Sequence, residues 1–196
     1  PVEAGEHPLP PWRAWLDDDL LSNRVFEGVN RVSTARPSWV PRINRITSRI
    51  LSSREFTTAS HRVFASQRDV RFREMEYALP ADQVVPAFNE VRALIAERGW
   101  RISFPIEVRF AASDDLWLST AHGRESGYIA VHRYYRENPT EYFEAVERIM
   151  TARGGRPHWG KMHTLDAEQF AQRYPRFADF VALRERLDPQ RRFTNT

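Results

Sequence analysis

The chain has 196 residues, a formal net charge of +3 and a hydrophobic fraction of 41%. This length and composition are typical of a globular chain with a buried core and exclude an intrinsically disordered one. Because cysteine is absent, disulfides, zinc–thiolate sites and cysteine nucleophiles are excluded within the chain. No apolar run approaches the roughly 20 residues of a transmembrane helix. The chain begins with Pro1, so we expect a piece of a longer protein.

The basic residues are almost all arginine, and Lys161 is the single lysine among 29. The basic excess suggests a nucleic-acid partner, but the arginines alternate with acids, as where Arg71 and Arg73 precede Glu74 and Glu76. Mixed signs are typical of a solvated surface, so we expect no nucleic acid to bind. An ammonium is a compact charge and a guanidinium is a planar fork. One lysine in an arginine-rich chain therefore favours a site that needs an ammonium, with chance retention as the alternative.

The N-terminal segment is predicted to be an arm or linker. Prolines and the acidic run Asp17–Asp19 interrupt residues 1–41, and the apolar residues between Leu20 and Val29 allow one short helix. We expect residues 1–53 to be irregular and to pack against another domain.

Beyond this segment the pattern becomes regular and predicts three strands and four helices. The predicted strands are Val70–Leu79, Phe104–Phe110 and Tyr128–Tyr134, and the predicted helices are Asp82–Gly99, Asn138–Gly154, Ala167–Tyr174 and Phe177–Leu187. Asp82 and Asn138 are suitable N-caps, and glycine ends each of the first two helices. This order predicts an α+β fold with a largely antiparallel sheet and helices packed on one face.

Two predicted strands carry polar residues on one face. Side chains alternate across a strand, so Glu107 and Arg109 share a face, and we expect the apolar residues Ile106, Val108 and Phe110 to face the helices. If this strand pairs with the next, His132 joins the polar face. Charged groups held on a strand can bind a polyol through charge-assisted hydrogen bonds. An ordinary salt-bridged surface is the alternative.

Residues 154–163 combine three glycines, a proline, a tryptophan, two histidines and the single lysine. Glycine permits close backbone approach, and such a mixture is unusual for a plain connection. The glycines match neither a GxGxxG motif nor a P-loop. Two histidines without a well-spaced carboxylate are a weak metal signal, so we expect no metal. An irregular loop around a packed Trp159 is the alternative to a functional site.

The segment His158–His163, with the sequence HWGKMH, resembles the H-W-(G/A)-K-x-H signature of the aldonolactone oxidoreductases. Two upstream segments, Pro105–Phe110 and Met75–Pro80, are similar to strands of the same family. The resemblance covers roughly residues 39–196 and rests on both signatures occurring in this order.

The resemblance implies an N-terminal FAD-binding domain and a C-terminal cap domain that closes the substrate site over the flavin. Residues 54–196 would then be the substrate-binding cap, and the FAD-binding domain would lie outside this chain. The implied activity is FAD-dependent oxidation of the C2 hydroxyl of an aldono-1,4-lactone such as L-gulono- or D-arabinono-1,4-lactone. Oxygen or a cytochrome would be the electron acceptor. We expect this chain alone to be inactive.

The resemblance also implies roles for individual residues. Glu107 and Arg109 match the family's Glu-x-Arg pair, expected to bind the substrate and to be catalytic, and His132 is added to the substrate site by its strand position. Lys161 matches a catalytic lysine that stabilises negative charge on the reduced flavin. The implied flavin contacts are His158, Trp159, Lys161 and Asn195.

Several alternatives stay open. The cap of an alditol oxidase, which acts on an acyclic polyol, is a related enzyme class. A basic binding module for RNA or an acidic partner, and a regulatory domain whose ancestral site is unused, are non-enzymatic alternatives. We expect a cytoplasmic protein. Because members of the family are often membrane-associated, peripheral attachment to a membrane is the alternative.

Overall fold

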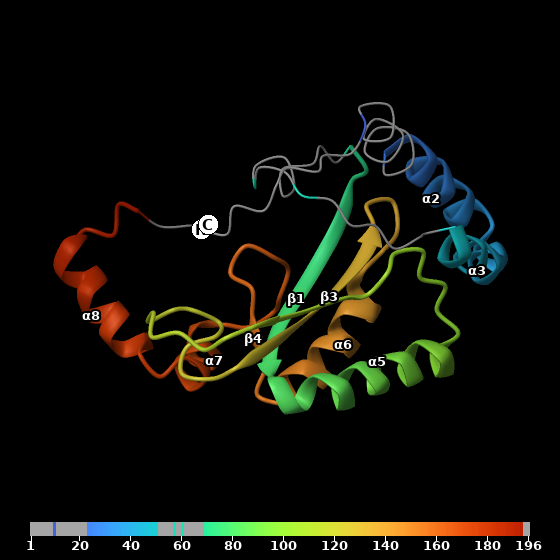
Figure 1. The fold of residues 1–196 in the computed structure, drawn as a ribbon. Helices are drawn as coiled ribbons and strands as arrows, with labels where there is room; N and C mark the ends of the chain where they lie inside the picture. The colour runs from blue at the N-terminus through green and yellow to red at the C-terminus, as the bar shows by residue number, and fades with distance from the viewer. Residues whose placement is uncertain (1–9, 11–22, 51–56, 58–59, 61–68, 194–196) are drawn as a thin grey trace. The chain divides into compact units, whose positions relative to one another are not determined.

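The computed structural model describes residues 10, 23–50, 57, 60 and 69–193 (Figure 1). The chain divides into two compact units, which are treated separately below. The first takes in residues up to Phe72 together with Arg101–Ser103 and Arg133–Glu137, and the second takes in the rest. Among the described residues, no helix is long and apolar enough to cross a membrane.

The described part of the first unit is more helical than its proline pattern predicted. Helix α2 (Phe26–Ala35) begins inside the predicted short helix, the 3-10 turn η2 (Pro37–Trp39) follows, and α3 (Val40–Ile50) was not predicted. Proline is tolerated here because it occupies the start of η2, where its missing N–H costs no helical hydrogen bond. Buried Asn30 accepts a hydrogen bond from Ser103 Oγ at 2.7 Å and ties α2 to this unit.

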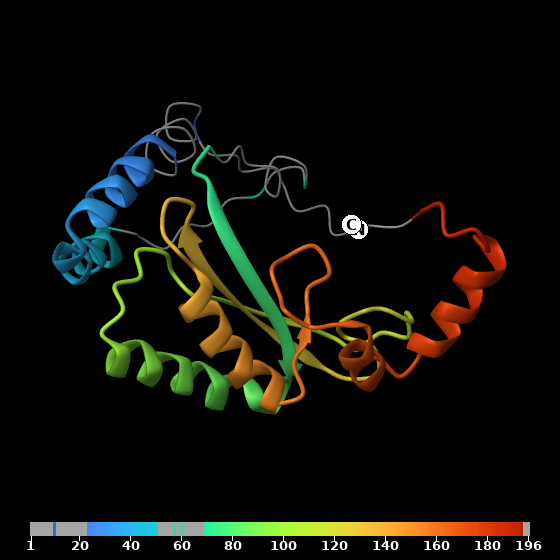
Figure 2. The ribbon, with the colours of Figure 1, turned by 180° about the vertical axis from the view of Figure 1, so that it is seen from behind.

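A four-stranded sheet with the order β2-β3-β1-β4 forms the body of the second unit (Figure 1). Its strands are β1 (Phe72–Pro80), β2 (Glu107–Ala111), β3 (Ser126–Tyr134) and β4 (Arg156–Pro157). The pairs β2–β3 and β1–β4 are antiparallel, and the arrows of β1 and β3 also run in opposite directions (Figures 1 and 2). The predicted α+β class with an antiparallel sheet is confirmed.

Helices cover one face of this sheet, as Figure 2 shows for α6 and α5. The helices of this unit are α5 (Val84–Arg98), which follows the 3-10 turn η3 (Ala81–Gln83), α6 (Thr140–Ala152), α7 (Ala167–Arg173) and α8 (Phe177–Leu187). Gly99 ends α5 in the left-handed conformation, with φ 64°, as its sequence position predicted. Asn138 Oδ1 accepts a hydrogen bond from Thr140 N at 3.0 Å, but the N-cap of α6 is Pro139, so the predicted N-cap Asn138 lies one residue too early.

The N-cap predicted at Asp82 is also wrong. Asp82 lies within η3, and the residue before α5 is Gln83, which makes no capping hydrogen bond. The chain leaves β1 through a 3-10 turn, and this turn takes up the position from which Asp82 would have capped the helix.

The core lies between the sheet and its helices. Met75, Tyr77 and Leu79 of β1 are at most 2% exposed, and so are Val91 of α5 and Met150 of α6. Each such side chain contributes about 1.5–3 kcal/mol through burial. The odd-numbered residues of β1 therefore point to the helices, which leaves Glu74 and Glu76 for the opposite face.

The apolar face of β2 is more exposed than predicted. Val108 is 40% exposed and Phe110 is 65% exposed, although we expected the helices to bury both. The reason is the position of β2 at the edge of the sheet, because an edge strand has a neighbour on one side only. Phe110 does lie over Gly127, where a Cβ atom would stand 2.3 Å from Val84 Cγ2. Only glycine fits at this crossing.

Candidate functional site

The face of the sheet opposite α5 and α6 gathers charged side chains from three strands. The register of β2 and β3 pairs Glu107 with Ala130 and Arg109 with Tyr128, so His132, two residues beyond Ala130, shares their face. The condition on which His132 was expected to join the polar face, that the two strands pair, is thus met. On the other side of β3, strand β1 adds Glu74 and Glu76 to the same face.

Six residues form what we call the ionic cluster: Glu74, Glu76, Glu107, Arg109, His132 and Lys161. Lys161 Nζ donates to Glu74 at 2.5 Å and to Glu76 at 2.9 Å, and Arg109 Nη2 also donates to Glu76. His132 Nε2 lies 3.2 Å from Glu74 and 4.0 Å from Glu107. The structure thus brings together four of the predicted site residues, and their partners Glu74 and Glu76 were not among those predicted.

Burial differs sharply within the ionic cluster. The side chain of Glu76 is 1% exposed and that of Lys161 is 18% exposed, whereas Arg109 is 58% exposed. A buried carboxylate requires charged or hydrogen-bonded partners, and Glu76 has two cations. The cluster therefore has a buried base at Glu76 and an exposed rim at Arg109 and Glu107. A ligand can contact the cluster at this rim.

The electrostatics of the cluster are most visible at Glu74. Burial acts to raise the pKa of Glu74, but hydrogen bonds from His132 and Lys161, together with the charge of Lys161, outweigh burial and lower this pKa to about 2. Glu74 is therefore ionised throughout the physiological range. A fixed negative charge at this point holds the ammonium of Lys161 in place.

The loop that carries Lys161 follows the same edge of β1 with which β4 pairs. Pro157 pairs with Tyr77 in β4, His158 N donates to Glu76 O at 2.9 Å, and Met162 N donates to Glu74 O at 3.0 Å. The backbone on both sides of Lys161 is thus hydrogen-bonded to the strand that bears its two carboxylate partners. This geometry fixes where the ammonium can lie.

A buried network anchors the end of the same loop. Glu147 of α6 accepts hydrogen bonds from Tyr77 Oη at 2.5 Å and from Thr164 N at 2.9 Å, and Thr164 Oγ1 also donates to it. Burial, followed by the hydrogen bond to Glu147, raises the pKa of Tyr77 well above its ordinary value. The hydroxyl of Tyr77 therefore keeps its proton, so it acts as a donor to Glu147.

The side chains of Trp159 and His158 make their hydrogen bonds with residues outside the ionic cluster. The indole of Trp159 stacks on Phe170 with ring centroids 4.4 Å apart, and its Nε1 donates to Leu118 O at 2.9 Å. The residue remains 43% exposed, so it is held in place while one side stays accessible. His158 is exposed, and its Nδ1 accepts a hydrogen bond from Gly160 N at 3.1 Å. Asn195 lies outside the described residues.

Sequence reasoning missed the two carboxylates of β1, because Glu74 and Glu76 follow two arginines and resemble a salt-bridged surface. A signal was present: the two acids alternate with the apolar residues Met75 and Tyr77, as Glu107 and Arg109 do in β2. Acids at alternate positions of a strand mark a polar face. Among the described residues, no group of three or more His, Asp or Glu side chains could hold a metal ion.

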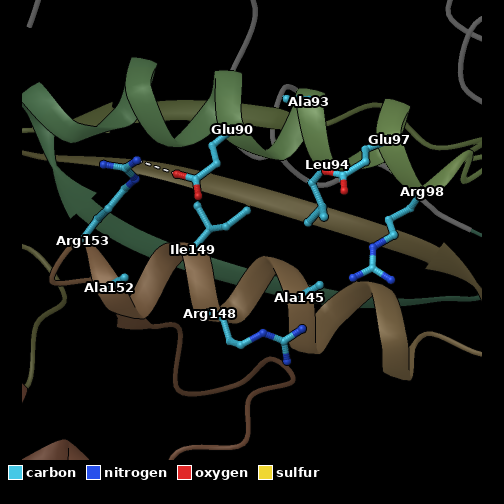
Figure 3. A pocket seen from close by; sticks show the side chains of 10 residues that line it. All are labelled: Glu90, Ala93, Leu94, Glu97, Arg98, Ala145, Arg148, Ile149, Ala152 and Arg153. Atoms are coloured by element: carbon cyan, nitrogen blue, oxygen red, sulfur yellow. Dashed lines mark hydrogen bonds and ion pairs between the residues drawn. The ribbon is translucent and has the colours of Figure 1, made fainter.

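A groove of about 580 Å³ lies elsewhere, between α5 and α6 on the helical side of the sheet (Figure 3). Three of its charged residues are engaged in ion pairs: Arg153 pairs with Glu90 at 2.5 Å, and Arg98 pairs at 3.6 Å with Glu141, which does not line the groove. Its floor is formed by small and aliphatic side chains such as Ala145. We regard the groove as the gap between two packed helices and the ionic cluster as the candidate site.

Comparison with known proteins identifies relatives across nearly the whole chain. Residues 2–196 match the family model described as D-arabinono-1,4-lactone oxidase. An L-gulono-1,4-lactone dehydrogenase of Mycobacterium tuberculosis is 44% identical over 188 residues, which is 96% of this chain and 44% of the relative. An L-gulonolactone oxidase of Bos taurus is 32% identical and shares 92% of this chain and 43% of its own length.

A more distant relative is an alditol oxidase of a Streptomyces species, which is 36% identical over 129 residues, or 63% of this chain and 30% of the relative. The chain thus spans less than half the length of the curated relatives described above.

Proposed function

Because this chain belongs to the D-arabinono-1,4-lactone oxidase family, we propose that it is the substrate-facing half of an FAD-dependent oxidoreductase that oxidises the C2 hydroxyl of an aldono-1,4-lactone. The observation that carries the proposal is the ionic cluster. Arg109 and Lys161, from separate segments, converge on buried Glu76 at the face of the sheet opposite α5 and α6, and Glu107 shares the exposed rim with Arg109. These are the residues at which the family signatures match.

The chemistry of these residues fits a flavin. An ammonium and a guanidinium at one face can stabilise the negative charge that a flavin ring acquires on reduction. A flavin bound against this face supplies the two-electron acceptor. In the proposal, Lys161 and the exposed side of Trp159 contact its ring, and His158 and Asn195 lie at the same boundary.

The chain's own side chains orient the lactone. Glu107, on the rim, accepts a hydrogen bond from a substrate hydroxyl, and Arg109 donates to an oxygen of the lactone. His132 lies between Glu74 and Glu107 and limits where the substrate can lie. Because two carboxylates hold Lys161 before any ligand arrives, its charge needs no reorganisation during the reaction.

The complete protein carries the activity in this proposal. We propose that the FAD-binding portion lies outside this chain, so the chain alone is expected to be inactive. Both the dehydrogenase and the oxidase named among the relatives match it. Oxygen and a cytochrome are therefore the two candidate acceptors, which steady-state turnover in air and under argon with added cytochrome c distinguishes.

The decisive experiment follows flavin absorbance near ~450 nm in the complete protein after anaerobic addition of L-gulono-1,4-lactone or D-arabinono-1,4-lactone. Loss of the yellow colour with a lactone supports the proposal. A flavin that ignores lactones and is reduced by xylitol or sorbitol assigns the protein to the alditol oxidases, the second candidate that the Streptomyces relative supports. A colourless protein contradicts both.

A further inference from the structure

We propose that Glu76 is a positioning residue for the reaction: its buried carboxylate holds Arg109 and Lys161 side by side, and Ala130 leaves the space through which Arg109 reaches it. This inference rests on the proposed function. Glu76 itself is 1% exposed, so it acts on a ligand through its two cationic partners.

The pair between Arg109 and Glu76 crosses a strand. Arg109 is on β2 and Glu76 is on β1, and β3 lies between those strands in the sheet. The guanidinium passes the ring of Tyr128, with its Cζ 5.9 Å from the ring centroid, before it donates to Glu76. An arginine that extends across a neighbouring strand has many alternative rotamers, and a charged partner at the far end selects one of them.

Ala130 makes this crossing possible. It lies on β3 between Tyr128 and His132 on the face that carries the ionic cluster, and it pairs directly with Glu107. Ala130 is 1% exposed, so the side chains of that face cover it. A larger residue here would occupy the path from Arg109 to Glu76 while leaving every charged group of the cluster in the chain.

The two cations depend on Glu76 to different degrees. Lys161 has a second partner, because Glu74 lies 2.5 Å from its Nζ. For Arg109, Glu76 is the one carboxylate within ion-pair distance in the described part of the chain. Removing the charge of Glu76 should therefore release Arg109 fully and loosen Lys161 partly.

The test is a double-mutant cycle in the complete protein. We expect Glu76→Gln to lower kcat/KM for the lactone by about 10- to 100-fold, with a rise in KM, because Arg109 binds substrate. In an Arg109→Ala background, Glu76→Gln should lower kcat/KM for the lactone by less than about threefold. Ala130→Leu should reproduce the loss. Glu90→Gln, which removes an exposed acid paired with Arg153 on the opposite side of the sheet, is the matched control.

A second measurement is independent of activity. Trace acetylation followed by mass spectrometry of the peptide that contains Lys161 should show a roughly threefold to tenfold faster reaction in Glu76→Gln. Thermal unfolding confirms that each variant is folded. Equal losses with and without Arg109, or unchanged acetylation, would overturn the positioning role. If the wild-type protein leaves lactones unoxidised, the proposed function fails, and the acetylation rates still decide whether Glu76 holds Lys161.

Discussion

At the scale of single residues, the main feature is an ammonium held between two carboxylates in a chain that otherwise uses arginine. Lys161 Nζ lies 2.5 Å from Glu74 and 2.9 Å from Glu76. The sequence pointed to this lysine by its rarity, and the structure shows why its shape matters. A compact ammonium fits between two acids that are two residues apart on one strand. A planar guanidinium can donate only in the fixed directions of its fork.

We expect Lys161→Met in the complete protein to slow flavin reduction by about 100-fold while changing substrate affinity by less than about threefold. The physical reason is that a charge which stabilises the reduced flavin acts mainly in the transition state. Stopped-flow reduction at a series of lactone concentrations separates the two quantities. Unchanged reduction kinetics would show that Lys161 is structural.

Glu74 predicts a pH dependence of stability. Its pKa is about 2 in the folded chain against an ordinary value of 4.5, so the folded state prefers the ionised form. The ionised carboxylate therefore stabilises the fold above pH 4.5, and this stabilisation is lost as the pH falls toward 2. We expect Glu74→Gln to lower the free energy of unfolding by about 3 kcal/mol near neutrality. Urea unfolding from pH 7 to pH 3 should show this difference shrinking below about pH 4.5, and a constant difference would contradict it.

At the scale of elements, the loop between β4 and α7 is held at both ends. Its start is hydrogen-bonded to β1, and its end is bonded to Glu147 through Thr164. Gly155 permits the entry, because a Cβ atom there would stand 2.5 Å from Met150 O. A loop fixed in this way keeps Lys161 beside β1 without help from a ligand.

The anchor at Glu147 is testable by itself. We expect Glu147→Gln to lower the free energy of unfolding by about 2 kcal/mol, since a buried acceptor of three hydrogen bonds becomes an amide with one oxygen. Glu144→Gln, on an exposed position of the same helix, should change it by less than about 0.5 kcal/mol. Chemical denaturation measures both, and equal effects would show that the network adds nothing to stability.

Elements with a strong local signal could be predicted from the sequence. Helix α8 has the predicted bounds Phe177–Leu187, and Gly99 ends α5 as expected. Features set by the tertiary structure could not. Glu76 is buried because a loop about 85 residues further along the chain covers it, and β2 exposes Phe110 because it is an edge strand. Neither fact is encoded in the spacing of neighbouring residues.

At the scale of the whole chain, the clustering of the candidate site residues was easier to predict than their environment. The family signatures identified Glu107, Arg109 and Lys161, and the structure brings these together with His132. The roles of all these residues, and those of His158, Trp159 and Asn195, stay predictions, because the structure shows where the described side chains lie and not what they bind. An edge strand with exposed apolar side chains is also a property of the chain as a whole.

We expect Phe110→Asp to reduce self-association of the chain at high concentration, because Phe110 is 65% exposed on an unpaired edge of the sheet. The free energy of unfolding should change by less than about 1 kcal/mol. Light scattering across a concentration series measures the effect. Leu187→Asp is the control, because Leu187 is 72% exposed but lies on a helix. Equal behaviour of the two variants would exclude the edge strand as the cause.

Cleavage of the backbone beside the single lysine can also report when the loop that carries Lys161 detaches from β1. A lysine-specific protease has one peptide bond to cut in these 196 residues, between Lys161 and Met162. Met162 N is hydrogen-bonded to Glu74 O at 3.0 Å, so the bond must leave β1 before it can enter a protease. Cleavage into two fragments would therefore time the detachment of this loop, and its rate would give the free energy of that opening separately from global unfolding.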